Sequence, residues 1–209
     1  HTIDLNGTAT SVRTANWTVY KDAEGEVWTA QGYATGTNFD TFTLVDPVSI
    51  TKRDLAGHVL EEIQAVREST SGKLTAADSF PQSSYVRWAT HQYTECCRES
   101  SQRVYHTIPA SGEGAEGTNY DQANYDYDNL QRQNRHVTPG GTITRKVFDV
   151  RGNVVKSYVG TDDTGATPND PTGDGAEGNN MVLVTENEYD GGEAGGDNDL
   201  TQVTQHVNG

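Results

Sequence analysis

One short phrase recurs along this chain: an aromatic residue followed by Asp-x-x-Gly, set between two runs that alternate polar and apolar side chains. The clearest copy is Phe148-Asp149-Val-Arg-Gly152. The aspartate can accept hydrogen bonds from nearby backbone N–H groups, and the glycine can take the positive φ that closes a tight turn. The phrase therefore predicts a β-hairpin, and its repetition predicts an array of like units.

The residues around this copy support the hairpin. Residues 142–148 alternate with the period of two that is typical of strands, and a second strand is expected over 153–159. The distance from Asp128 to Asp149, 149 − 128 = 21 residues, accommodates two strands and two turns but no helix. Six turns of this kind are expected in all, and they lie at 22–25, 54–57, 94–97, 128–131, 149–152 and from Asp190 onward.

Two glycine-rich segments match each other almost residue for residue. They are Ser-Gly-Glu-Gly-Ala-Glu-Gly-Thr-Asn at 111–119 and Thr-Gly-Asp-Gly-Ala-Glu-Gly-Asn-Asn at 172–180, which lie 172 − 111 = 61 positions apart. We interpret Pro139-Gly140-Gly141 as the short form of the turn opposite Asp-x-x-Gly, and the two segments as its long forms. Both are therefore expected to project from one edge of the sheet.

Composition limits the classes of fold and partner. Only 33% of the 209 residues are hydrophobic, 22 are glycine, and the mean hydropathy is −0.74. This composition favours a one-layer hairpin array over a single compact core. The net charge of −15 disfavours binding to nucleic acid or to anionic lipid, and no stretch approaches the roughly 20 apolar residues of a membrane helix. We therefore expect neither a nucleic acid partner nor membrane insertion.

The chain begins at His1 and lacks the features of a secretion signal over residues 1–20. We interpret it as a fragment of a longer polypeptide, whose flanking repeats would be its first partners and whose localisation signal lies outside the fragment. The two cysteines, Cys96 and Cys97, are adjacent, so a disulfide between them would strain the backbone. They say nothing about the redox compartment.

The aromatic-Asp-x-x-Gly phrase at 148–152, the related segment 127–132 and the terminal Tyr189-Asp190 resemble the tyrosine-aspartate (YD) repeats of RHS-type proteins. This family includes bacterial polymorphic toxins, the shells of insecticidal toxin complexes, and teneurins. The resemblance implies an all-β fold: repeated antiparallel β-hairpins that form part of a spiralling sheet or shell. It covers residues 85–209, with Gly- and acid-rich loops at 110–119 and 160–180, and is degenerate over residues 1–84.

Several positions depart from the family pattern. Lys21 and Arg53 replace the aromatic residue, Thr94 replaces the aspartate, and Cys97 and Gln131 replace the glycine. The turn at Asp190 is also interrupted before a strand resumes at Leu200. The family resemblance implies that the shell encloses a C-terminal toxin or cargo domain, or acts as a scaffold for contact at the cell surface. The implied location is extracellular or on the bacterial cell surface.

The aromatic residues before the turns allow two interpretations. Tyr93, Tyr127, Phe148 and Tyr189 could form a stacking platform for sugars or bases, or a structural ladder whose rings pack on one another. Because equivalent positions align in a laterally stacked sheet, we expect the ladder.

The acidic loops also allow two interpretations. Residues 162–165 and 170–174 are rich in Asp and Gly, as are calcium-binding loops, but neither supplies a strict Asp-x-Asp-x-Asp-Gly run. We expect disordered, solvated loops instead. The element Asp170-Pro171-Thr172-Gly173 is similar to the one that ends RHS shells near a self-cleaving protease, but its position inside a polar loop disfavours that role.

No catalytic, cofactor-binding or metal-binding residue is predicted. His91 and His106 flank the two cysteines, but structural zinc sites favour cysteines separated by two to four residues, and Cys97 fits the glycine position of a turn. Neither a nucleophile elbow nor a phosphate-binding loop is present. The sequence thus predicts a structural β-shell segment without a cofactor and without enzyme activity. The alternative is an extracellular calcium- or carbohydrate-binding adhesion module.

Overall fold

The computed structural model describes residues 2–5, 8–193 and 196–207. Its strands are β1 (Thr2–Leu5), β2 (Thr8–Ser11), β3 (Arg13–Lys21), β4 (Glu26–Thr35), β5 (Thr41–Arg53), β6 (Val59–Ala65), β7 (Tyr85–Tyr93), β8 (Glu99–Tyr105), β9 (Tyr120–Tyr127), β10 (Gln133–Val137), β11 (Ile143–Phe148), β12 (Val154–Gly160), β13 (Val182–Tyr189) and β14 (Leu200–Gln205). Three short 3₁₀ helices, η1 (Gln82–Ser84), η2 (Gly173–Gly175) and η3 (Asp190–Gly192), complete the described elements, which include no α-helix.

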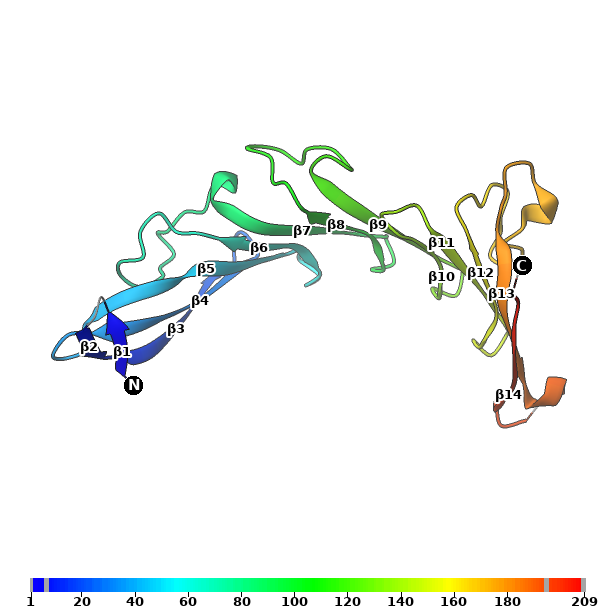
Figure 1. The fold of residues 1–209 in the computed structure, drawn as a ribbon, viewed down its shortest axis with the longest axis horizontal. Helices are drawn as coiled ribbons and strands as arrows, with labels where there is room; N and C mark the ends of the chain where they lie inside the picture. The colour runs from blue at the N-terminus through cyan, green and yellow to red at the C-terminus, as the bar shows by residue number, and fades with distance from the viewer. Residues whose placement is uncertain (1, 6–7, 194–195, 208–209) are drawn as a thin grey trace. The chain divides into compact units, whose positions relative to one another are not determined.

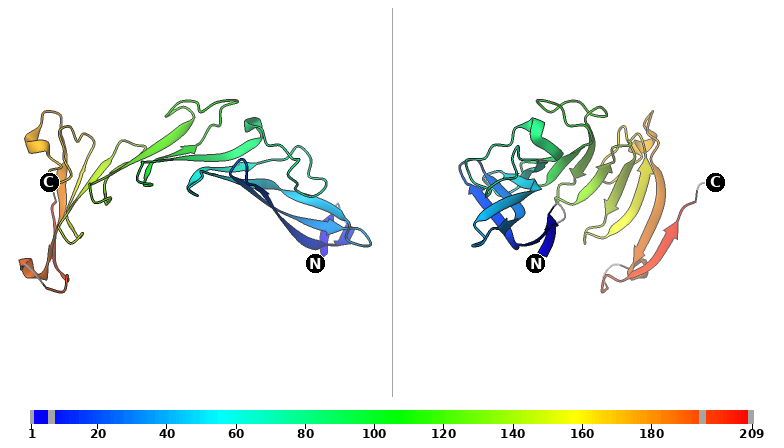
Figure 2. Two further views of the ribbon diagram at one scale, coloured as in Figure 1. Left: turned by 180° about the vertical axis from the view of Figure 1, so that it is seen from behind. Right: turned by 60° about the vertical axis from the view of Figure 1, so that its left-hand side comes forward.

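The strands β3 to β14 form one twelve-stranded sheet in which each strand lies beside its neighbours in sequence (Figure 1), and β1 pairs with β2 separately. The same succession of neighbouring strands can be followed by colour in Figure 2. The prediction of an all-β array of antiparallel hairpins is confirmed. In the clearest repeat, β11 pairs with β12 around the turn at 149–152 as expected.

The chain divides into two compact units. Unit 1 comprises residues 1–92 and 102–121, and unit 2 comprises residues 93–101 and 122–209. Consecutive connections in an antiparallel run leave from opposite ends of the strands. Within each unit, the Asp-x-x-Gly turns therefore lie at one edge, here called the turn edge, and the other connections lie at the opposite edge, here called the loop edge.

Unit 1 contains a hydrophobic core, which composition did not predict. Its members are Trp28, Ala30, Leu44, Val48, Ile50, Ile63, Ala65, Leu74, Trp88, Tyr105 and Tyr120. Most come from alternate positions of neighbouring strands, so they share one face of the sheet. Leu74, which is 4% exposed, comes instead from the connection 66–84. That connection therefore acts as the second layer over the sheet.

The buried Arg67 holds this connection in shape. Its guanidinium group donates hydrogen bonds to the carbonyl oxygens of Ser71 and Lys73, at 2.7 and 2.9 Å, and lies 3.5 Å from the carboxylate of Asp78. The connection is also bonded to the sheet, because Leu44 N–H donates to the Thr70 carbonyl at 2.7 Å. The carbonyl groups that face the buried Arg67 need hydrogen-bond partners, and this one arginine supplies several of them.

Unit 2 has a different cover on its sheet, the connection 161–181. Pro171 is fully buried and Met181 is 6% exposed. The side chain of Asn179 donates to the carbonyl oxygens of Thr164 and Pro171, and that of Asn180 accepts from two backbone N–H groups. The segment therefore has a defined, hydrogen-bonded conformation in place of the expected disorder, while many of its residues are exposed to solvent as expected. Its amide and carboxylate side chains satisfy its own backbone, which charge composition alone does not reveal.

The two glycine-rich segments share the backbone conformation of their glycines but differ between these glycines, since Asp174 has φ of 53° inside η2 and Glu113 does not have a positive φ. Three glycines with positive φ occupy matching positions in each segment: Gly112, Gly114 and Gly117 in the first, and Gly173, Gly175 and Gly178 in the second. Each segment lies in a loop-edge connection, between β8 and β9 or between β12 and β13. The prediction that both project from this edge is confirmed.

Candidate functional site: the turn edge and a polar pocket

The turns that begin at Asp54, Asp128 and Asp149 share one hydrogen-bond pattern. In the turn that begins at Asp149, Gly152 N–H donates to the Asp149 carbonyl at 3.2 Å, and Asp149 N–H donates to the Asn153 carbonyl at 3.0 Å. One carboxylate oxygen of Asp149 also accepts from the backbone N–H groups of Arg151 and Asn153, at 2.8 and 2.9 Å. The aspartate thus plays the role that the sequence predicted for it.

The irregular turns adopt the same geometry. Cys97 and Gln131 have φ of 64° and 62°, so they occupy the position that glycine fills with φ of 96° at Gly152. Thr94 replaces the aspartate, and its hydroxyl accepts from Arg98 N–H at 3.2 Å. The interpretation of Cys97 as a residue in the glycine position is confirmed.

The residue that follows the turn also belongs to the motif in three repeats, although the sequence pattern did not indicate it. His58, Arg132 and Asn153 each follow a turn, and each side chain bonds to the second carboxylate oxygen of its aspartate, at 2.7 to 2.9 Å. The recurrence of a hydrogen-bond donor four residues after the aspartate is the sequence signal that could have revealed this position. The carboxylate therefore bonds to both backbone and side chain.

These hydrogen bonds change the acidity of the turn aspartates. Burial alone would raise the pKa of Asp128, but hydrogen bonds from the backbone and side chain of Arg132 outweigh it, so this pKa is lowered. The pKa of Asp149 is lowered in the same way, with Asn153 as the main donor. An ionised aspartate carboxylate therefore stabilises each of these turns.

Three of the four aromatic residues before the turns, Tyr127, Phe148 and Tyr189, contact carbonyl or guanidinium groups in place of the ring-on-ring contacts expected for a ladder. Tyr127 donates its hydroxyl to the Glu99 carbonyl at 2.8 Å, and Tyr189 contacts the Val154 carbonyl at 3.4 Å. The ring of Phe148 lies 4.6 Å beneath the guanidinium carbon of Arg132. The residues contacted lie at the first position of a strand, Glu99 in β8 and Val154 in β12, or just before one, Arg132 before β10. In each case this strand follows the previous turn of the turn edge.

Side chains also connect neighbouring turns in unit 2. Arg132 donates to the Asp149 carbonyl at 2.8 Å, and Arg151 pairs with the Asp190 carboxylate at 2.8 Å. The turns at 128–131 and 149–152 and the one that begins at Asp190 are thus joined in sequence order. This arrangement stiffens the edge of the sheet without a disulfide or a metal.

The loop edge of unit 2 contains a charge cluster. Arg135 and Arg145 are direct partners in the pairing of β10 with β11, and each donates its Nε to the Asp163 carboxylate at 2.6 Å. Burial raises the pKa of Asp163, but the hydrogen bonds from the two arginines outweigh this effect, so the pKa is lowered. Asp163 therefore serves as an anchor for the connection 161–181.

The remaining candidate residues lie apart from one another. His91 pairs with Glu62 at 3.6 Å, while His106 contacts its neighbour Thr107. Cys96 and Cys97 are exposed and carry free thiols. In the part of the chain that the structure describes, no group of three or more His, Cys, Asp or Glu side chains could hold a metal ion. None of the described helices is long and apolar enough to span a membrane.

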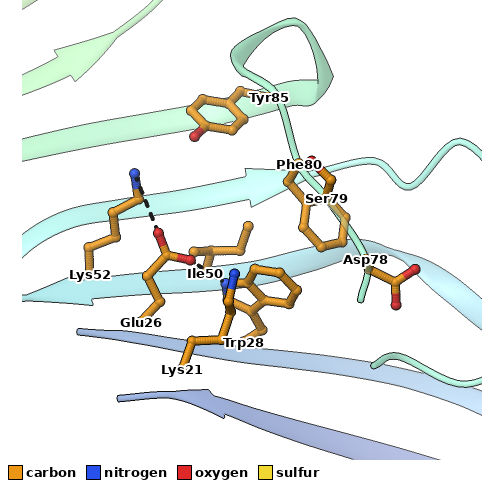
Figure 3. A pocket seen from close by; sticks show the side chains of 9 residues that line it. All are labelled: Lys21, Glu26, Trp28, Ile50, Lys52, Asp78, Ser79, Phe80 and Tyr85. Carbon is orange, nitrogen blue, oxygen red and sulfur yellow. Dashed lines mark hydrogen bonds and ion pairs between the residues drawn. The ribbon is translucent and has the colours of Figure 1, made fainter. Parts of the chain in front are cut away.

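Unit 1 contains a polar pocket of about 190 Å³ beside its core (Figure 3). Glu26, Lys52 and Glu61 stand side by side on β4, β5 and β6, and the Lys52 ammonium lies 3.7 Å from Glu26 and 3.3 Å from Glu61. Each carboxylate also accepts an indole N–H, at 2.8 Å from Trp28 and 3.0 Å from Trp88. Glu26 and Lys52 line the pocket, whereas Glu61 and Trp88 lie outside its lining and act on Lys52 only through the Glu61 carboxylate.

The charges of this pocket influence one another. Burial would lower the pKa of Lys52, but the nearby Glu61, Tyr85 and Glu26 raise it, with a raised pKa as the result. Burial also raises the pKa of Tyr85, whose hydroxyl is directed toward the Lys52 side of the pocket in Figure 3. At neutral pH, Lys52 is therefore an ammonium group and Tyr85 a neutral phenol. The lysine is a hydrogen-bond donor here and not a nucleophile.

Comparison with known proteins gives structural neighbours only. No protein-family model matches the chain, and no curated protein matches it. The chain is similar to the crystal structure of TcdB2-TccC3-Cdc42 over 88% of its length, at 11% identity and a TM-score of 0.40. It is similar to that of TcdB2-TccC3-TEV over 86%, at 12% identity and a TM-score of 0.30. It spans 8% and 9% of the lengths of those chains.

Proposed function

We propose that this chain is a structural segment in the wall of an RHS/YD-repeat shell. One observation carries the proposal: the sheet has a strictly sequential strand order, with an Asp-x-x-Gly-type turn at every second connection. Such a sheet can be extended at either end by further hairpins, since each new hairpin needs only its predecessor. Its function is then to separate an enclosed space from the surroundings.

The contacts of the turn edge support this role. Arg132 and Arg151 join successive turns, and the aspartates are bonded to their own turns. Such contacts stabilise the spacing of the hairpins. We propose that the wall belongs to a secreted or surface-displayed protein and that it encloses a toxin or cargo domain, or presents a surface for contact between cells. No enzyme activity is proposed for the segment itself.

The outer strands provide a test. β3 and β14 are the outermost strands of the sheet, so each has one edge that flanking repeats would cover in a longer polypeptide. We expect the isolated chain to self-associate through these edges. Val203→Lys on β14 should reduce the association, because a lysine on an outer strand opposes strand addition. Sedimentation velocity would measure it.

A matched control is Val150→Lys. Val150 is 98% exposed at the tip of a turn and Val203 is 50% exposed on β14. The control should self-associate like the parent chain. A monomeric parent chain with a single sharp unfolding transition would overturn the proposal, as would equal effects of the two substitutions.

A further inference from the structure

The polar pocket of unit 1 has features that a wall does not require. Its cations Lys21 and Lys52 are matched by the anions Glu26 and Asp78. Lys52 is shared between two carboxylates, and the Lys21 ammonium lies 4.6 Å above the Trp28 ring. The lining therefore has no net charge with which to select an ion.

Hydrogen-bonding groups nevertheless remain available in the pocket. Tyr85 and Ser79 both line the pocket, and neither hydroxyl group is hydrogen-bonded within the part of the chain that the structure describes. The Lys52 ammonium has three N–H groups and only two carboxylate neighbours. The Asp78 carboxylate accepts from Thr75 N–H at 2.8 Å through Oδ2 and lies 3.5 Å from Arg67, so its Oδ1 can still accept a further bond at the edge of the pocket. Donors and acceptors thus line the same small space.

The pocket also has an apolar wall. Phe80 is half-buried and meets the Trp28 ring edge-on, with the ring centres 5.1 Å apart and the planes at 87°. Figure 3 shows Phe80 on one side of the pocket and Lys52 on another. A volume of about 190 Å³ is smaller than that of a drug-sized site, which starts at about 300 Å³. Only a single small molecule would fit a pocket of this size.

From these features we propose that the pocket binds a neutral, hydroxyl-rich ligand of monosaccharide size. Adjacent hydroxyl groups of a pyranose both donate and accept, which matches a lining of mixed carboxylate, ammonium and hydroxyl groups. The apolar face of the sugar ring packs against Phe80. The turn aromatics are not involved, because Tyr127 and Tyr189 bond to backbone carbonyls. This activity is separate from the proposed wall function.

Saturation-transfer NMR with the full chain tests the proposal. The probes are the methyl glycosides of glucose, galactose and mannose at millimolar concentration, with sodium acetate and methylammonium chloride as ionic controls. We expect saturation of at least one glycoside and of neither ion. The absence of saturation for all three glycosides would overturn the proposal, and so would stronger saturation of either ion.

Three variants locate the site. Tyr85→Phe and Ser79→Ala each remove one hydroxyl group from the lining and should weaken glycoside binding about tenfold. Ser79 is exposed, so its replacement leaves folding intact. Tyr20→Phe is the matched control, since Tyr20 is 69% exposed outside the pocket, and it should bind like the parent chain. Unchanged binding in both pocket variants would place the sugar elsewhere and overturn the assignment.

Discussion

Arg135 stands directly opposite Arg145 in the pairing of β10 with β11. Like charges at such positions destabilise a sheet, yet here both guanidinium groups donate to the Asp163 carboxylate at 2.6 Å. The connection 161–181 therefore supplies the anion that the two arginines share, and Asp126 on β9 pairs with Arg135 as well, at 2.8 Å.

Asp163→Asn should lower the free energy of unfolding by about 2–3 kcal/mol, because it leaves two facing arginines without their shared anion. This loss of stability is smaller than that expected for a fully buried ion pair, because the Asp163 side chain is 13% exposed. Urea denaturation at pH 7 would measure the change. Glu177→Gln, at an exposed position of the same connection, should change the stability by less than about 0.5 kcal/mol. Equal effects of the two would contradict the anchoring role.

Stability should fall in acid. The pKa values of Asp128, Asp149 and Asp163 are lowered in the folded state, below the unfolded value of about 3.9. The stabilisation is therefore fully present above this value and is lost as the pH falls through each folded-state pKa. Urea midpoints between pH 7 and pH 2 would follow the loss. The decline should be shallower in Asp163→Asn than in the parent chain, and parallel curves would refute the assignment.

Gln131→Gly should stabilise the protein by about 0.5–1 kcal/mol. Gln131 has φ of 62°, which costs a residue with a side chain about 1–2 kcal/mol, and the greater freedom of glycine in the unfolded chain offsets part of the gain. Gly152→Ala is the reciprocal control, because an added Cβ there meets no atom within 4 Å and its effect is only conformational. It should destabilise by about 1 kcal/mol. Thermal melting would show shifts of opposite sign, and shifts of the same sign would contradict this account.

Phe148→Ala should destabilise unit 2 by about 1–2 kcal/mol, since it removes a half-buried ring and its contact with Arg132. Phe148→Leu keeps most of the apolar volume but loses the cation contact, so it should fall between the parent and the alanine variant. Thermal melting would rank the three proteins. An unchanged melting temperature in the alanine variant would show that this ring does not support the turn edge.

Millimolar Ca²⁺ should leave the melting temperature unchanged. Asp163 is paired with two arginines, while Asp162 and Asp170 already accept hydrogen bonds within their own loop. Stabilisation of the fold by Ca²⁺, and its reversal by a chelator, would favour the calcium-binding adhesion module over the wall segment.

The turns and strands could be predicted from sequence because their determinants are local. Asp149 and Gly152 lie within one turn, and even Cys97 was placed by its position relative to Thr94. The turn spacing then assigned the two glycine-rich segments to the loop edge. The residues within each turn were therefore sufficient to predict the array of hairpins.

The covers over the sheet could not be predicted in this way. Arg67 organises the connection 66–84 through bonds to several carbonyl groups, and Asp163 reaches residues 18 and 28 positions away. Nothing in the neighbouring sequence specifies these partners, because they depend on which strands the folded sheet brings beneath each connection. The same holds for the pocket around Lys52, whose walls come from β3, β4, β5, β7 and the connection 66–84.

The two glycine-rich segments have a consequence for how such a chain can change its length. Between them lie β9, β10, β11 and β12, an even number of strands. Unequal recombination between the two near-identical stretches would insert or delete these four strands as one module of 61 residues, 172 − 111. The side chains on each face of the sheet would keep that face, so such an array could become longer or shorter by whole hairpins.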